Sequence, residues 1–165
     1  MRSRKLEFEG AVDVGLIVIA HFKNPAWTYA RDFLRDVLGL RKRCIVPLTT
    51  YFGAYIIMTK YLKINRNEVA TALVTTLSID SPAFYENIPR YIAVEAIKTS
   101  EGLNISSWDG YLLELARNLN MKRIYTIDEE LKRRSKDFNV INPIPSDVMK
   151  EYHEYVAKRI KAKKK

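Results

Sequence analysis

The spacing of hydrophobic and polar residues in the first part of the chain predicts a strand followed by a helix. Residues 6–12 alternate in a weakly strand-like way, and the apolar run 14–20 that follows fits a strand or a helix equally well by periodicity. Asn24-Pro25 is typical of a helix start, with Asn as the cap and Pro at the first helical position. Apolar residues then keep helical spacing until Gly39, so a helix is expected there.

The middle of the chain is predicted to be mainly helical. Residues 44–46 form a short β-prone run that Pro47 stops, and Thr49 or Thr50 can cap a helix that reaches about Leu62. Residues 65–68 have the spacing of a capping box and begin a helix through about Leu77. Ser81-Pro82 is expected to open a further helix, with a break or a restart near Pro89.

The last third alternates between helices and strands. Ser106 and Ser107 are candidate caps of a helix, residues 123–127 and 138–141 read as strands, and residues 129–136 form a short charged helix between them. After Ser146 the pattern fits a last helix or a frayed tail. Such alternation predicts an α/β fold: three layers, α/β/α, with a mainly parallel central sheet.

Composition excludes several classes of protein. The 165 residues, 47% of them hydrophobic, are enough for one domain with its own core. The single cysteine, Cys44, rules out an intrachain disulfide framework and a cysteine cluster for zinc. The longest apolar run is far shorter than the roughly 20 residues that span a bilayer, and the N-terminus does not resemble a signal peptide. We therefore expect a cytoplasmic protein without a membrane partner.

The net charge of +9 is concentrated at the two ends of the chain. Residues 1–5 hold three basic side chains and residues 158–165 hold six, with no acid in either segment, so the body between them is neutral. Two interpretations stay open: the ends are electrostatic arms that recruit a polyanion such as RNA, or they are solubilising tails.

Three aspartates stand where a parallel α/β fold gathers its reactive groups. Asp13 follows the first predicted strand, Asp128 follows the strand at 123–127, and Asp109 lies in the first turn of a helix that would start from the same edge of the sheet. Together they would make an oxygen-rich site suited to magnesium or manganese. Each also has a local alternative, since Asp13 fits a turn, Asp109 complements a helix dipole and Asp128 fits an N-cap.

Three segments of the chain resemble the PIN domain, a family of metal-dependent ribonucleases that includes the toxins of toxin–antitoxin pairs. They are FEGAVDVGLIVIAHF, CIVPLTTYFGAY, and SSWDGYLLELARNLNMKRIYTIDEEL followed by FNVINP. The resemblance implies one PIN-like domain over residues 1–144, including the basic arm 1–5, with residues 145–165 as a helical extension and basic tail. It also implies that residues 14–22 form a helix.

The resemblance assigns roles to individual residues. Asp13, Asp109 and Asp128 match the family's metal-binding and catalytic acids, and Thr126 matches the small hydroxyl residue two positions before the last acid. The activity it implies is hydrolysis of single-stranded RNA by Mg²⁺ or Mn²⁺ ions that activate a water. An antitoxin-type or other protein partner and a homodimer are further expectations from the resemblance.

Two positions depart from the family pattern. The family places a glutamate in the helix after its second strand, whereas residues 47–58 contain no acid, and Val14 stands where a Ser or Thr commonly follows the first acid. Glu129 and Glu130 could compensate, or could be solvated first-turn acids. The alternative function is therefore an impaired PIN-like module that binds RNA or a protein without cleavage.

Two further groups of side chains could contact RNA. Arg133 and Arg134 follow Asp128 closely and are candidate phosphate contacts, although they also fit a solvated helix face. Tyr51, Tyr55 and Tyr61 recur at near-helical spacing and could stack on unpaired bases or pack in the core or in a dimer interface.

Overall fold

The computed structural model describes residues 7–163, which form five strands and nine helical segments around one parallel sheet. In chain order the elements are β1 Gly10–Val12, α1 Val14–Ala20, α2 Trp27–Leu38, β2 Cys44–Pro47, α3 Thr49–Ile56, the π-helix η1 Ile57–Tyr61, α4 Arg66–Leu77, β3 Phe84–Tyr85, α5 Arg90–Leu103, α6 Ser107–Asn118, β4 Arg123–Tyr125, α7 Glu129–Arg134, β5 Asn139–Ile141 and α8 Ser146–Ala162. The basic arm 1–5 and the last two lysines lie outside the described residues.

The sheet has the strand order β3-β2-β1-β4-β5, and every neighbouring pair is parallel. The chain moves outward from β1 to β2 and β3 on one side, then crosses to β4 and β5 on the other side. The order therefore reverses between β1 and β4. In open parallel sheets, ligand sites form at the carboxyl ends of the strands at such a reversal.

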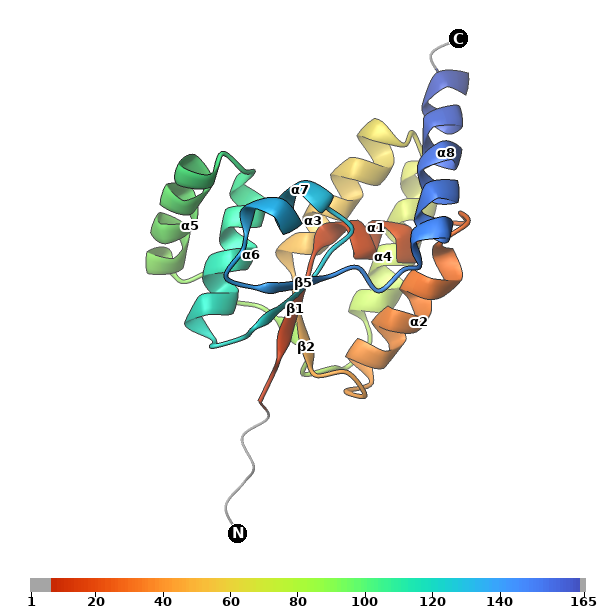
Figure 1. The fold of residues 1–165 in the computed structure, drawn as a ribbon. Coiled ribbons are helices and arrows are strands. Elements are labelled where there is room, and N and C mark those ends of the chain that lie inside the picture. The colour runs from red at the N-terminus through yellow and green to blue at the C-terminus, as the bar shows by residue number, and fades with distance from the viewer. Residues whose placement is uncertain (1–6, 164–165) are drawn as a thin grey trace.

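Helices cover both faces of the sheet (Figure 1). Because side chains alternate along a strand, Val12, Val46 and Tyr125 face a core made with α1, α2, α3, α4 and α8. Their neighbours Ala11, Ile45 and Ile124 face a second core made with α5, α6 and α7. This is the predicted three-layer α/β/α fold with a parallel sheet.

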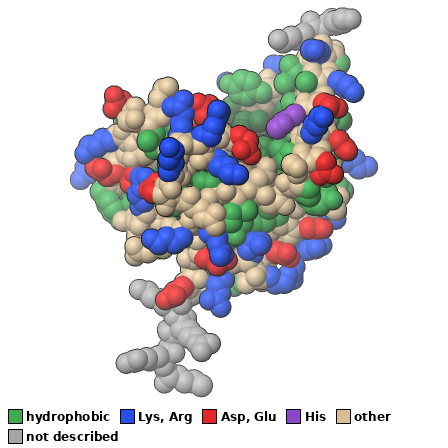
Figure 2. Space-filling model, in the orientation of Figure 1, with side chains coloured by type: hydrophobic (Ala, Val, Ile, Leu, Met, Phe, Trp, Pro, Cys, Tyr) green, Lys and Arg blue, Asp and Glu red, His purple; other side chains and the backbone are tan. Residues whose placement is uncertain are grey.

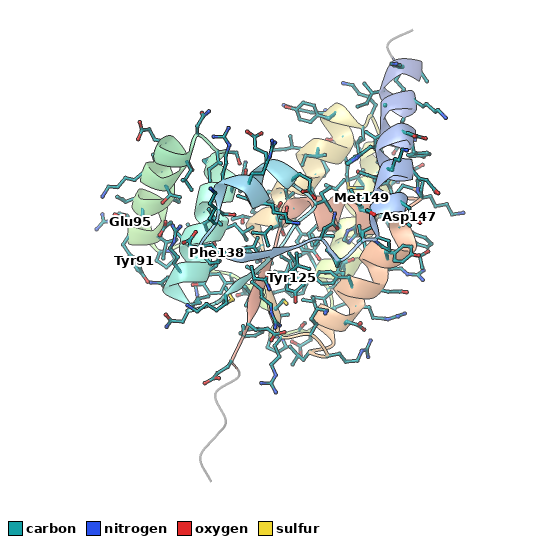
Figure 3. The ribbon with its side chains drawn as sticks, in the orientation of Figure 1. Tyr91, Glu95, Tyr125, Phe138, Asp147 and Met149 are labelled. Atoms are coloured by element: carbon teal, nitrogen blue, oxygen red, sulfur yellow. The ribbon has the colours of Figure 1, made fainter. Side chains whose placement is uncertain are left out.

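The last helix is part of the packed body. Met149 and Tyr152 of α8 are buried in the same core as Tyr125 of β4, and Figure 3 shows Met149 and Tyr125 on their two elements. Arg159 donates a hydrogen bond to the carbonyl of Leu62, and Lys163 donates one to that of Lys63. Of the two interpretations of residues after Ser146, the structure has the helix, through Ala162.

Several helix and strand predictions are confirmed within a few residues. Residues 14–20 are helical, as the family resemblance implied, and Asn65 caps α4 through hydrogen bonds from the backbone of Asn67 and Glu68. The helix expected at Asn24 begins at Trp27 instead, because Asn24 makes the preceding turn and donates to the carbonyls of Ile19 and Phe22. The helix expected from Thr49 to about Leu62 changes from α to π at Ile57.

The predicted helix from Ser81-Pro82 is wrong. Phe84 and Tyr85 instead form the edge strand β3, paired with Val46 and Pro47 of β2. Ser81 does not cap a helix: its hydroxyl donates to the carbonyl of Leu38 and accepts from the amide of Ala83. The helix starts only after Pro89, at Arg90, in agreement with the restart expected there. Figure 3 shows Tyr91 and Glu95 on this helix, and the hydroxyl of Tyr91 donates a hydrogen bond to Asn118 of α6.

None of the helices within residues 7–163 is long and apolar enough to cross a membrane.

Candidate functional site

Asp13 lies at the carboxyl end of the central strand, where the backbone of the next residue holds its side chain. It is the single residue between β1 and α1, and its Oδ1 accepts a hydrogen bond of 2.7 Å from the amide of Val14. Only 7% of Asp13 is exposed. The residue therefore caps a helix, as its turn-like position suggested, and also presents a buried carboxylate at the strand-order reversal.

Thr126 connects Asp13 to Asp128. The register of β1 and β4 pairs Val12 with Tyr125, so the next residues, Asp13 and Thr126, lie side by side. The Thr126 hydroxyl donates to Asp13 Oδ2 at 2.6 Å and accepts from the Asp128 amide at 3.0 Å. Thr126 is buried, so this hydroxyl is a fixed link between the two acidic segments. The structure thus gives the sequence-predicted threonine a definite position next to Asp13.

Asp128 and Asp109 both make the local contacts that their positions favour. Asp128 is the N-cap of α7, and its Oδ1 accepts from the amides of Glu130 and Leu131. Asp109 lies in the first turn of α6, where its Oδ2 accepts from the Ser106 hydroxyl. Within residues 7–163, no hydrogen bond of the protein reaches Asp128 Oδ2, whereas the backbone of Ser106 also hydrogen-bonds to the Asp109 carboxyl. Capping therefore leaves one oxygen of the Asp128 carboxylate available.

The three carboxylates are close enough to influence one another's protonation. Burial raises the pKa of Asp13 from the ordinary 3.8 to about 6, and the negative charges of Asp109 and Asp128 add to the rise, against the hydrogen bonds from Thr126 and Val14. Burial also raises the pKa of Asp109, together with the charges of Asp128 and Glu130. Three segments distant in sequence thus bring their acids within electrostatic range of one another, and the charge of Glu130 acts in addition on Asp109.

The chemistry of this group fits a hard divalent cation. Carboxylate oxygens are ligands that Mg²⁺ and Mn²⁺ prefer, and a cation would offset the repulsion that adds to the effect of burial on these pKa values. As the side chains stand, however, residues 7–163 contain no group of three or more His, Cys, Asp or Glu that could hold one ion. Binding would therefore require the carboxylates to draw closer.

Comparisons with known proteins show the fold. No family model matches the chain, and no curated protein matches it in sequence. Among solved structures, the protein PAE2754 from Pyrobaculum aerophilum has a TM-score of 0.57 at 14% identity, over 93% of this chain and 97% of that chain. A chain in a toxin–antitoxin complex from Klebsiella pneumoniae has a TM-score of 0.50 at 16% identity, over 82% of this chain and 98% of that chain.

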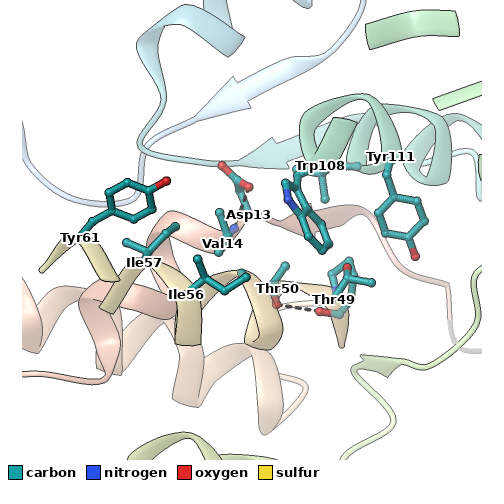
Figure 4. Close-up of a pocket in the computed structure, with 12 residues that line it drawn as sticks. Asp13, Val14, Thr49, Thr50, Ile56, Ile57, Tyr61, Trp108 and Tyr111 are labelled. Atoms are coloured by element: carbon teal, nitrogen blue, oxygen red, sulfur yellow. Dashed lines mark hydrogen bonds between the residues drawn. The ribbon is translucent and has the colours of Figure 1, made fainter. Parts of the chain in front are cut away.

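The helix that would carry the family's glutamate faces Asp13 without an acid. Gly53 of α3 lies so close to Val14 that a Cβ at this glycine would be 3.1 Å from Val14 Cγ2. Gly53, Thr49 and Thr50 line a pocket that also contains Asp13 (Figure 4). The helix is therefore in place beside the candidate site, but its facing positions are small or apolar.

The two candidate arginines differ in their surroundings. Arg134 pairs with Glu130 at 2.7 Å and donates to the carbonyl of Leu103 at 2.8 Å, so its guanidinium connects α7 with the end of α5. Arg133 is exposed on α7. On the face shown in Figure 2, Lys and Arg side chains are interspersed with acidic ones. Of the two, Arg133 is the freer to contact a phosphate.

Sequence reasoning missed Trp108 and the pocket that it borders. Trp108 precedes Asp109 in the first turn of α6 and is 47% exposed. The tyrosines of the 51–61 segment divide: Tyr51 is buried in the core, whereas Tyr61 is 65% exposed and lines the pocket. A large aromatic residue directly before a candidate site acid was the one signal in the sequence that could have identified Trp108.

Proposed function

We propose that this protein is a PIN-type ribonuclease that hydrolyses single-stranded RNA with Mg²⁺ or Mn²⁺ held by Asp13, Asp109 and Asp128. The observation that carries the proposal is the link through Thr126, which joins Asp13 to the Asp128 segment at the strand-order reversal, with Asp109 close enough to raise the pKa of Asp13. The fold similarity to a chain of a toxin–antitoxin complex supports the same assignment and suggests a protein partner that controls the activity.

The bound metal would supply an activated water and would neutralise charge that develops on the phosphate. The protein's own residues would prepare the site for it. The amide of Val14 and the hydroxyl of Thr126 fix the orientation of Asp13, and the backbone of α7 fixes Asp128. Each hydrogen bond uses one lone pair of a carboxylate oxygen, which leaves others for a cation.

Cleavage of a labelled, unstructured RNA tests the proposal. We expect cleavage with Mn²⁺, none with EDTA, and a loss of at least about 100-fold in Asp128→Asn, since changes that merely support a metal ligand cost up to about 100-fold. Asparagine caps helices as well as aspartate does, so Asp128→Asn should fold normally. Asp147→Asn, which changes an exposed first-turn acid of α8, is the matched control and should cleave like the wild type. Equal cleavage by the wild type, Asp128→Asn and Asp147→Asn would exclude the proposed site.

The alternative, a PIN-like module that binds RNA or a protein without cleavage, has one observation in its favour. No residue of α3 that faces Asp13 is acidic, so the candidate site has one carboxylate fewer than the family pattern.

Installing a carboxylate on α3 should strengthen metal binding. Gly53→Glu would place an acid on the helix face next to Asp13, and Val14 would have to move by a few tenths of an ångström to admit its Cβ. We expect the Mn²⁺ concentration that half-saturates a thermal shift to fall roughly tenfold. Phe52→Glu adds the same charge one residue earlier, at a side chain that is 66% exposed and outside the pocket. If the half-saturating Mn²⁺ concentration fell equally in both variants, the added charge and not its position would be the cause of the tighter metal binding.

A further inference from the structure

An apolar pocket adjoins Asp13. It has a volume of about 210 Å³ and lies between α3, the π-helix η1 and the start of α6. Among the described residues that line it, Asp13 is the one charged side chain; the others include Val14, Ile56, Ile57 and Leu112. Whatever occupies this pocket touches the carboxylate that the proposed function makes central, yet it must be largely uncharged.

Two exposed aromatic side chains border the pocket. Trp108 comes from the first turn of α6, and Tyr61 comes from the last residue of η1; Figure 4 shows Asp13 between them. They are 47% and 65% exposed, so the faces of both rings are open to a ligand. The π-helix that carries Tyr61 is a rare element that is often found at functional sites.

We infer that this pocket binds one unpaired base of the RNA whose phosphodiester lies at Asp13. The inference rests on the proposed function and adds how the substrate is recognised. An RNA base is a flat, uncharged group attached to an anionic backbone. The acids repel phosphates from the pocket except where a cation intervenes, while the aromatic rings favour a base. In a duplex the bases are stacked and paired, so this contact would also select single strands.

Two of the hydroxyls that line the pocket already have partners within the protein, and we expect stacking to dominate the recognition of a base. The hydroxyl of Thr50 already donates to the carbonyl of Pro47 at 2.7 Å, and the hydroxyl of Tyr111 donates to that of Asn87 at 3.3 Å. Their protons are therefore engaged within the protein. Recognition by stacking is tolerant of sequence because every base has a π-face. We expect the pocket to require a base at one position of the RNA without specifying which base.

An abasic scan of the substrate tests the inference. A short unstructured RNA is prepared with a single abasic ribose at each position in turn, and its affinity is measured with Ca²⁺ and, separately, its cleavage with Mn²⁺. We expect one position at which loss of the base weakens binding by roughly 5- to 150-fold, the range given by stacking of one base on an aromatic side chain.

Three variants connect that position to the pocket. Trp108→Leu keeps an apolar side chain but removes the π-face. This variant should bind intact RNA as weakly as the wild type binds the RNA that is abasic at the critical position. It should therefore no longer distinguish intact from abasic RNA. Trp108→Phe should restore most of the discrimination. Tyr29→Leu is the matched control, because Tyr29 is 46% exposed on α2 and lies outside the pocket; it should behave like the wild type.

The outcomes separate this inference from the proposed function. Mn²⁺-dependent cleavage with equal affinity for intact and abasic RNAs at every position would overturn the base pocket and leave the ribonuclease intact; the pocket would then suit an apolar side chain of a protein partner. A base requirement that Trp108→Leu abolishes, without any cleavage, would uphold the pocket and overturn catalysis. A base requirement that Trp108→Leu leaves unchanged would place the base elsewhere and overturn the inference.

Discussion

Replacing Asp13 with asparagine should abolish metal-dependent cleavage and at the same time stabilise the metal-free protein. The loss of activity should be at least about 100-fold, because the change removes a proposed ligand rather than a residue that supports one. Asparagine can still accept the hydrogen bond from the amide of Val14, so the start of α1 should be kept. Cleavage assays and thermal unfolding of the same preparations measure both effects.

The gain in stability follows from the pKa of Asp13. Folding raises this pKa from 3.8 to about 6, so between these pH values the folded protein binds more protons than the unfolded chain. The free energy of unfolding therefore falls as the pH rises from about 4 to 6. Above pH 6 it stays lower by about 3 kcal/mol, the value that corresponds to this change in the pKa of Asp13. Asp13→Asn removes this cost and should gain roughly 1–3 kcal/mol at neutral pH.

Two comparisons test the prediction for Asp13→Asn. Added Mn²⁺ should raise the unfolding temperature of the wild type and not that of Asp13→Asn, because the cation stabilises only the form that binds it. The fall in stability between pH 4 and 6 should be flatter in the variant. If Asp13→Asn is less stable than the wild type at neutral pH and still cleaves RNA, Asp13 is a structural cap and the site lies elsewhere.

The acids of the candidate site were accessible to sequence reasoning because local patterns fix their positions. Asp13 directly follows the apolar strand β1, and Asp128 follows β4 after two further residues, so a parallel sheet brings both to one edge. Asp109 begins a helix whose cap, Ser106, is a strong local signal. Their proximity needed the fold class, which the alternation of strands and helices and the family resemblance suggested, and the strand order, which the structure supplied.

The edge strand and the pocket could not be predicted in the same way because they depend on tertiary contacts. β3 has only two residues, and it is a strand because Phe84 and Tyr85 pair with β2. Its flanking residues keep a helical spacing of apolar side chains, which gave the wrong element. The pocket is formed by α3, η1 and α6, and no local pattern relates Tyr61 to Trp108, which lie in different parts of the chain.

The close contact between α5 and α6 depends on Gly110, the residue after Asp109. A Cβ at this position would overlap the Ser100 hydroxyl and the carbonyl oxygen of Ala96 on α5. The Ser100 hydroxyl cannot simply rotate away, because it hydrogen-bonds to the carbonyls of Ala96 and Ser106. Ser106 is the N-cap residue of α6. A side chain at Gly110 must therefore separate the two helices.

Gly110→Ala should consequently destabilise the protein by about 3 kcal/mol, at the upper end of the usual cost of overpacking. It should also weaken Mn²⁺ binding, because the displaced start of α6 carries Asp109. Gly102→Ala is the matched control: Gly102 lies near the end of α5, and a Cβ there would meet nothing within 4 Å. This change should stabilise the helix by about 0.5 kcal/mol. Chemical denaturation measures the free energy of unfolding of both variants. If Gly110→Ala were as stable as Gly102→Ala, α5 would be able to move away from α6 at little cost.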